Sequence, residues 1–156
     1  MQVKQIMTRK IGACSATDTT SFAAGIMKER DCGFVPVSDG GRLAGVITDR
    51  DICMAAFERG VALAQLKVAS AMTSNVLTCS PEDTLERAEE IMRAGHVRRL
   101  PVVSTDGQLA GVVSLHDIAL AVVRAEGEEL LRGTPSEAHV ARTLAAIAGH
   151  RVVAAP

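Results

Sequence analysis

The sequence predicts a mixed α/β fold, of the α+β kind, in which a β-α-β-β-α unit occurs twice and one further helix follows. Internal repetition is the first observation, since Met7-Thr8 returns 65 residues later as Met72-Thr73. Turn chemistry is the second, because Asp39-Gly40-Gly41 and Asp106-Gly107 each separate two apolar runs. A single unit is too small to bury both of its faces, so the two copies are expected to pack together.

Each copy is expected to begin with a helical turn and a brief strand. The turns are predicted over residues 3–7 and 68–72, and the brief strands over 11–14 and 76–79. A helix follows in each copy, over residues 19–30 and 84–94. In the second copy, Asp83 is the expected N-cap, with Glu86 completing a capping box and Gly95 ending the helix.

Two strands and a second helix complete each copy. The strands are predicted over residues 34–37, 42–47, 100–103 and 108–113, and the helices over 49–59 and 115–124. Pro36 and Pro101 fall inside a strand, which suits an edge or an interruption of the sheet. The missing N–H leaves a neighbouring backbone group free to meet a ligand.

The stretch from Gly45 to Asp51 organises each copy and returns as Gly111 to Asp117. Glycine removes a side chain where another group must come close. Thr48 is the expected N-cap of the next helix, with Asp51 in its first turn. A hydroxyl at a helix N-terminus suits an anion, and the nearby acid suits a diol, so phosphate beside ribose fits both groups.

The domain boundaries follow from these patterns. The first repeat covers residues 3–60, a linker covers 61–67, the second repeat covers 68–124, and a C-terminal extension covers 125–156. Thr134-Pro135-Ser136-Glu137 predicts a capped helix over about 135–148, packed on the core or on a second subunit.

Composition limits the classes of function. The net charge is −1, with 17 basic and 18 acidic residues, so no global field attracts nucleic acid or an anionic membrane. Aromatic residues make up 2%, which argues against base-stacking platforms. No apolar run approaches the ~20 residues of a membrane span, and the N-terminus shows no secretory signal. These features predict a cytoplasmic protein.

The cysteines are Cys14, Cys32, Cys53 and Cys79. Their spacing fits neither close pairing nor a metal site, so buried thiols in a reducing compartment are expected. A thiol or metal sensor is a weaker alternative. No nucleophile, zinc or phosphate-loop motif of an enzyme is found, so we expect no catalytic residues, no metal and no required cofactor.

Each repeat resembles the cystathionine-β-synthase (CBS) domain, over about residues 3–124. The resemblance rests on Gly-Phe-Val-Pro-Val at 33–37, Arg-Arg-Leu-Pro-Val at 98–102 and Thr-Asp-Arg-Asp-Ile at 48–52. It implies a tandem pair, or Bateman module, with a pseudo-two-fold axis and two clefts between the repeats. Such clefts bind AMP, ADP, ATP or S-adenosylmethionine, and the module is usually regulatory and often a homodimer. The chain is most similar to the free-standing bacterial members.

The resemblance also implies ligand-binding residues. The ribose acids would be Asp51 and Asp117, and the adjacent hydroxyls Thr48 and Ser114 would touch phosphate or ribose. Phosphate contacts are implied for Arg50, His116, Arg98 and Arg99, adenine contacts for the backbone at Gly12, Ala13, Leu77 and Thr78, and a base pocket for Val35 and Leu100. Each acid also suits a simple helical first turn, and the arginines and His116 equally suit solvent.

The two repeats differ at one functional position, where Gly33-Phe34 in the first copy replaces Arg98-Arg99 in the second. The two clefts are therefore expected to differ in charge, and at least one to bind poorly or differently. The expected function is a sensor that binds an adenine nucleotide and signals to an unknown partner by changing the inter-repeat or dimer arrangement. The alternative is a ligand-free interaction module that acts through a dimer surface and the C-terminal helix.

Overall fold

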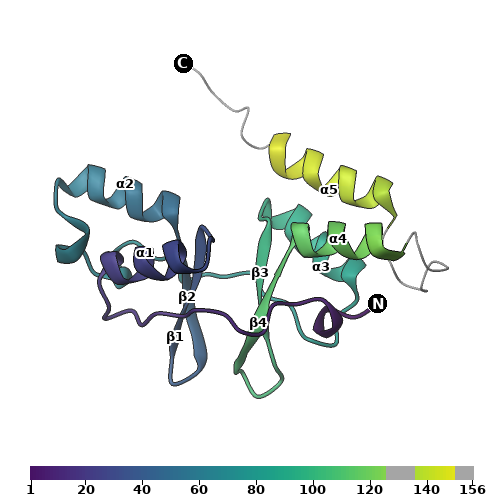
Figure 1. Cartoon of the computed structure of the whole chain (residues 1–156), viewed down its shortest axis with the longest axis horizontal. Helices are drawn as coiled ribbons and strands as arrows, with labels where there is room; N and C mark the ends of the chain where they lie inside the picture. The colour runs from purple at the N-terminus through teal and green to yellow at the C-terminus, as the bar shows by residue number, and fades with distance from the viewer. Residues whose placement is uncertain (126–135, 150–156) are drawn as a thin grey trace. The chain divides into compact units, whose positions relative to one another are not determined.

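The computed structural model describes residues 1–125 and 136–149 and confirms the mixed α/β class, with two small sheets and helices beside them (Figure 1). The elements of the first repeat are η1 (Val3–Gln5), α1 (Thr20–Glu29), β1 (Phe34–Asp39), β2 (Arg42–Thr48) and α2 (Asp49–Arg59), and η2 (Leu63–Gln65) lies in the linker. Those that follow are η3 (Val68–Ser70), α3 (Leu85–Gly95), β3 (Arg99–Val103), β4 (Leu109–Ser114), α4 (Leu115–Ala125) and α5 (Glu137–Gly149).

The chain forms two compact units that do not coincide with the sequence repeats. Of the described residues, unit 1 comprises 1–9, 77–106, 110–125 and 136–149, and unit 2 comprises 10–76 and 107–109. Val3, at the start of the first repeat, is fully buried in the core of unit 1, and Val68 is fully buried in the core of unit 2. The leading segment of each repeat thus completes the core of the unit built mainly from the other repeat.

Glycine makes this exchange of leading segments possible. In unit 2, Val46 and Thr73 exchange two backbone hydrogen bonds of 2.9 Å. A Cβ atom on Gly45 would lie 2.7 Å from the carbonyl oxygen of Thr73, and one on Gly111 would lie 2.7 Å from that of Thr8. The prediction that a group must come close to this glycine is confirmed, and that group is the backbone of the leading segment.

The predicted brief strands over 11–14 and 76–79 are wrong. In the first copy, the segment over 11–14 pairs with β1 through a single parallel bridge at Cys14. The Cys14 amide donates to the Pro36 carbonyl at 3.1 Å, and the Ser38 amide donates to the Cys14 carbonyl at 2.8 Å. The next bond of a parallel ladder would need an N–H at Pro36, which proline lacks. The second copy repeats this arrangement. The prolines are confirmed to lie in edge strands, because each sheet has two strands.

The helix ends follow local capping chemistry. The expected N-cap Asp83 is wrong, because Thr84 caps α3 and accepts a hydrogen bond from the Arg87 amide at 3.2 Å. The Asp83 carboxylate instead accepts from the Ser80 amide at 2.7 Å. The predicted C-terminal helix is confirmed as α5, whereas the Thr134-Pro135 part of its expected cap lies outside the described residues.

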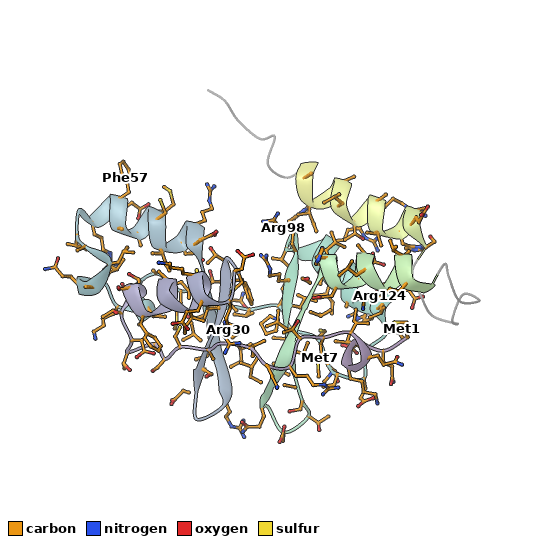
Figure 2. All side chains as sticks on the ribbon, viewed as in Figure 1. Met1, Met7, Arg30, Phe57, Arg98 and Arg124 are labelled. Carbon is orange, nitrogen blue, oxygen red and sulfur yellow. The ribbon has the colours of Figure 1, made fainter. Side chains whose placement is uncertain are left out.

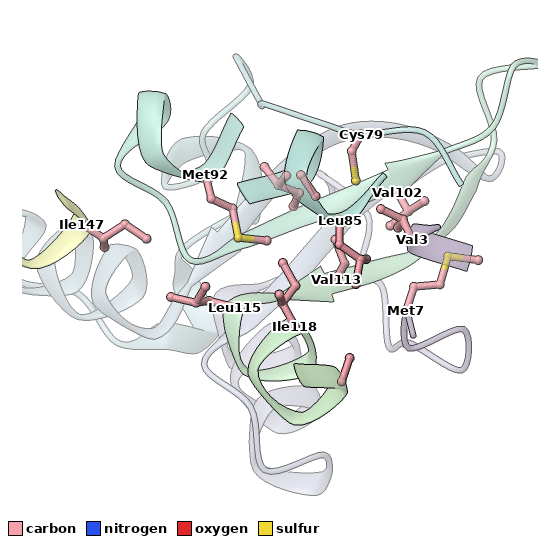
Figure 3. Packing of buried hydrophobic residues seen from close by; sticks show 13 residues of the cluster. Val3, Met7, Cys79, Leu85, Met92, Val102, Val113, Leu115, Ile118 and Ile147 are labelled. Atoms are coloured by element: carbon pink, nitrogen blue, oxygen red, sulfur yellow. The ribbon is translucent and has the colours of Figure 1, made fainter. Parts of the chain in front are cut away.

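In unit 1, α5 packs on α3 and α4 and belongs to the core (Figures 1 and 3). Ile147 is buried in the same core as Met92 and Leu115. The Thr143 side chain is fully buried, and its hydroxyl donates to Glu89 of α3 at 3.5 Å. Of the two expected positions for this helix, the one on the core is confirmed.

The cysteines are only partly as expected. Cys14 and Cys79 are buried, which confirms the prediction for these equivalent positions, whereas Cys53 is exposed and Cys32 is half-buried. Cys53 follows the buried Ile52 on α2 and therefore lies on the outer side of that helix. The expectation that all four thiols are buried is wrong.

Candidate functional site

Each Gly-to-Asp stretch folds into a reciprocal cap at the start of a helix. Thr48 is the N-cap of α2, and Asp51 lies in the first turn, as predicted. Asp51 Oδ2 accepts from the Thr48 amide at 2.9 Å and from the Thr48 hydroxyl at 2.7 Å. In return, the Thr48 hydroxyl oxygen accepts from the Asp51 amide at 3.2 Å. The first-turn acid therefore satisfies helix-end donors of its own segment.

The second copy has the same geometry. Asp117 Oδ2 accepts from the Ser114 amide at 2.8 Å and from the Ser114 hydroxyl at 2.6 Å, and the Asp117 amide donates to the hydroxyl oxygen at 3.2 Å. The hydroxyl proton is thus directed at the carboxylate, so Ser114 can accept from a ligand but must rotate before it donates to a phosphate. The described hydrogen bonds use Oδ2, which leaves Asp117 Oδ1 to accept from a diol.

Two arginines lie beside the start of α4 in unit 1. The backbone carbonyl of Arg98 accepts a hydrogen bond of 2.9 Å from the Leu115 amide, which fixes Arg98 to the first turn of this helix. Arg98, labelled in Figure 2, directly precedes β3, and Arg99 is the first residue of that strand. The positive end of the helix dipole and two guanidinium groups therefore act on the same space.

A pocket of about 290 Å³ occupies this space, entirely within unit 1. It is lined by residues at the start of β3, at the end of β4, in the first turns of α4 and on α5: Arg98, Arg99, Ser114, Leu115, His116, Ala119, Val140 and Leu144. Four expected ligand-binding residues thus come together here. Leu77, Thr78, Leu100 and Asp117 belong to unit 1 but are not part of this lining. Leu100 is instead fully buried in the core.

Val140 and Leu144 are pocket residues that the sequence analysis did not select. Both lie on the apolar stripe of the C-terminal helix, four residues apart, which is the spacing of one helix face. That stripe was the available signal, but it does not tell a core face from a ligand-binding wall.

Unit 2 contains the remaining candidates, with a different charge. Thr48, Arg50 and Asp51 lie at the start of α2, and Val35 is fully buried in the core. Gly12 packs closely on Ile26 of α1 and on Arg30, which follows that helix, and Ala13 is exposed beside it.

The position equivalent to Arg98 shows how the charge differs. A Cβ atom on Gly33 would lie 2.6 Å from Asp49 Oδ2, so a carboxylate fills the space next to this residue. In the second repeat, Leu115 replaces Asp49 and Arg98 replaces Gly33. Unit 1 therefore presents cations at this place, and unit 2 presents an acid.

Potential metal ligands, thiols and helices in the described part of the chain also bear on function. No three His, Cys, Asp or Glu side chains gather in a way that could hold a metal ion in residues 1–125 and 136–149.

Burial raises the pKa of the Cys14 thiol to about 11 and that of Cys79 to about 12, and nearby Asp18 and Asp83 act in the same direction. These two thiols are therefore protonated at neutral pH and poor nucleophiles. No helix within the described ranges is long and apolar enough to cross a membrane.

Comparisons with known proteins agree with this architecture. The family model of the CBS domain matches residues 3–58 and 68–124. The CBS domain-containing protein YhcV of Bacillus subtilis is 35% identical over 118 residues, which are 76% of this chain and 83% of that protein.

Among solved structures, CBSX2 in complex with AMP has a TM-score of 0.69 and 23% identity, covering 80% of this chain and 98% of CBSX2. The CBS domain pair of protein MJ0100, in complex with 5′-methylthioadenosine and S-adenosyl-L-methionine, has a TM-score of 0.69 and 24% identity, covering 78% and 94%. At these identities, the two likenesses show the fold.

Proposed function

Because the chain belongs to the CBS domain family, we propose that it is a regulatory, non-catalytic module of the cytoplasm that senses an adenine nucleotide, AMP, ADP or ATP. S-adenosylmethionine is the alternative ligand. Binding would change the arrangement of the repeats or of a homodimer and so alter the engagement of a partner protein. The ligand shifts that equilibrium only by its differential affinity for the two arrangements.

The cationic pocket of unit 1 carries this proposal. Arg98 and Arg99 flank the N-terminus of α4, and both features favour an anion. A phosphate group meets this requirement, whereas S-adenosylmethionine brings a sulfonium cation. The charge of the pocket therefore favours a nucleotide in unit 1.

The capping geometry supports roles for Asp117 and Ser114 around the ligand. Asp117 has Oδ1 available to accept from a ribose diol, because Oδ2 is held by Ser114. Ser114 then acts mainly by orienting this acid. In unit 2, the equivalent acid Asp51 is held in the same way by Thr48. The likeness to structures that hold AMP or S-adenosyl-L-methionine supports adenosine as the common part of the ligand.

Calorimetric titration of the whole chain with AMP, ADP, ATP and S-adenosylmethionine tests the proposal. We expect binding of at least one nucleotide, and Arg98→Ala should weaken it by about 10- to 100-fold, since a charged hydrogen bond contributes roughly 1.5–3 kcal/mol. Arg87→Ala is the control, because Arg87 lies on α3 in unit 1, 60% exposed and outside the pocket. A folded chain that binds none of the four ligands would rule the proposal out.

An interaction module is the second candidate function, favoured by exposed apolar residues at equivalent positions of the two repeats. Met54 and Phe57 on α2 are 42% and 80% exposed, and Leu120 and Val123 on α4 are 39% and 62% exposed. Phe57 stands out from its helix in Figure 2. We propose that these residues support a homodimer. Light scattering should show a dimer that Phe57→Ser weakens, and a wild-type chain that is monomeric at all concentrations contradicts it.

A further inference from the structure

We propose that α5 forms one wall of the nucleotide pocket in unit 1, so that Leu144 sets ligand affinity and bound ligand holds α5 in place. This inference rests on the proposed function and adds to it a means of regulation. It makes the C-terminal helix the element that responds to the ligand within unit 1.

The position of α5 is fixed by contacts that lie outside the pocket. Ile147 is buried in the core, and Thr143 is fully buried against Glu89 of α3. The backbone carbonyl of Ala146 lies 3.4 Å from His96 Nδ1, at the C-terminal end of α3. These contacts orient the helix so that Val140 and Leu144 contribute to the pocket lining.

The pocket lining combines two kinds of side chain. Arg98 and Arg99 supply positive charge, whereas Leu115, Val140 and Leu144 supply apolar surface. A ligand with an anionic end and a flat apolar end meets both requirements, as a nucleotide does with its phosphate and base. Leu144 is 52% exposed, so a ligand that covers it removes apolar surface from water.

The second repeat differs from the first where it faces this pocket. Leu115, which is 6% exposed and lines the pocket, replaces the exposed Asp49 of the first repeat. Ala119, a second lining residue, replaces the exposed Cys53. The apolar side chains at these two positions thus occur only in the second repeat, which α5 follows. The first repeat has no equivalent apolar lining at these positions.

A shared wall couples binding to helix docking. A ligand that contacts α5 only when the helix is docked must favour the docked state, and the docked helix must favour the ligand by the same factor. The α5 helix would thereby report occupancy of the pocket to any partner that contacts the C-terminal region.

Charge substitutions at Leu144 test the wall directly. Leu144→Glu removes this apolar group and adds a carboxylate to a pocket that holds an anionic ligand, so it should weaken ATP binding by about tenfold or more, with the largest effect at low salt. Leu144→Lys removes the same apolar group but adds a cation, so it should weaken ATP binding less than Leu144→Glu does. The control is Ala145→Glu, which makes the same charge change at an exposed neighbouring position of α5 outside the lining.

Hydrogen exchange supplies the second readout. Amides of α5 in the unaltered chain should exchange more slowly when ATP is bound, and this protection should be lost in Leu144→Glu. Circular dichroism confirms that each variant is folded.

The outcomes separate this inference from the proposed function. If ATP binds the unaltered chain and Leu144→Glu binds it as tightly as Ala145→Glu does, α5 is not a wall of the site, and the proposed function stands. Losses in Leu144→Glu and Leu144→Lys that both exceed the loss in Ala145→Glu support the wall, because each substitution removes the apolar group that the ligand covers. If the unaltered chain binds none of the nucleotides, both proposals fall.

Discussion

The carboxylate of Glu89 lies buried between α3 and α5 and should lower the stability of the chain at neutral pH. Glu89 is 1% exposed, and among the described residues its Oε2 atom has no hydrogen-bond partner and its Oε1 accepts one bond, of 3.5 Å, from Thr143. Replacement by methionine, which has a similar volume and no charge, should therefore stabilise the protein. The result runs against the usual expectation that a buried substitution destabilises.

The magnitude follows from the unpaired oxygen. A buried polar atom without a partner costs about 1–3 kcal/mol, and the long Thr143 bond returns roughly 0.5–1.5 kcal/mol at best. The net gain from Glu89→Met is thus up to about 2 kcal/mol, or up to about 8 °C in melting temperature for a chain of 156 residues.

The gain should depend on pH. Burial raises the pKa of Glu89 above its ordinary value of 4.5; Arg93 and the Thr143 hydroxyl act to lower this pKa, and Glu86 acts to raise it. Below pH 4.5, the carboxyl is protonated in both the folded and the unfolded chain. As pH rises through the raised pKa, the folded chain must ionise a buried group, so wild-type stability falls relative to Glu89→Met.

Thermal melts of both chains across this pH range measure the effect. The gap in melting temperature should be small in acid and widen to a plateau near neutral pH. Glu90→Met is the control, since Glu90 lies on the same helix, 53% exposed, and should change the melting temperature little at any pH. A wild-type chain that is the more stable one at neutral pH, or a gap that does not vary with pH, would refute the reasoning.

Three further predictions concern single positions. Gly111→Ala should destabilise unit 1 by about 1–3 kcal/mol, because the new methyl group meets a backbone carbonyl. Gly25→Ala should stabilise the chain by about 0.5–1 kcal/mol, because Gly25 lies in the middle of α1 with open space around it. Urea denaturation tests both. A thiol reagent at mildly alkaline pH should modify the exposed Cys53 at once and Cys79 only after unfolding, and equal rates would contradict the burial. Asp51→Ala should cost about 0.5–2 kcal/mol in denaturation without any ligand, since it removes a helix cap; an unchanged midpoint would exclude this role.

The sequence predicted the elements well where local chemistry decides them. The helix predicted over residues 49–59 is α2 within the same limits, because Thr48 caps one end and Gly60, in the left-handed region, ends the other. The brief strands failed, since the effect of Pro36 on a ladder depends on a partner segment that is distant in sequence. Propensity indicates what a segment favours, but pairing decides whether it becomes a strand.

The candidate site was predicted in part for the same reason. Arg98, Ser114 and His116 were selected and do line one pocket, because repeat spacing places them at the start of β3 and α4. Leu144 was not selected, since its role depends on where α5 docks. Glu89 gave no signal either, because it occurs on α3 among several acids and becomes buried only under α5.

The exchange of leading segments has a consequence for a chain that holds one repeat. Residues 68–124 expressed alone would lack Val3, which fills the core of unit 1, and would carry Val68 with no core to receive it. Two such half-length chains would each have to lend their first residues to the other, as in a domain swap. A half-length protein of this type is therefore expected either to remain unfolded or to fold only as an intertwined pair.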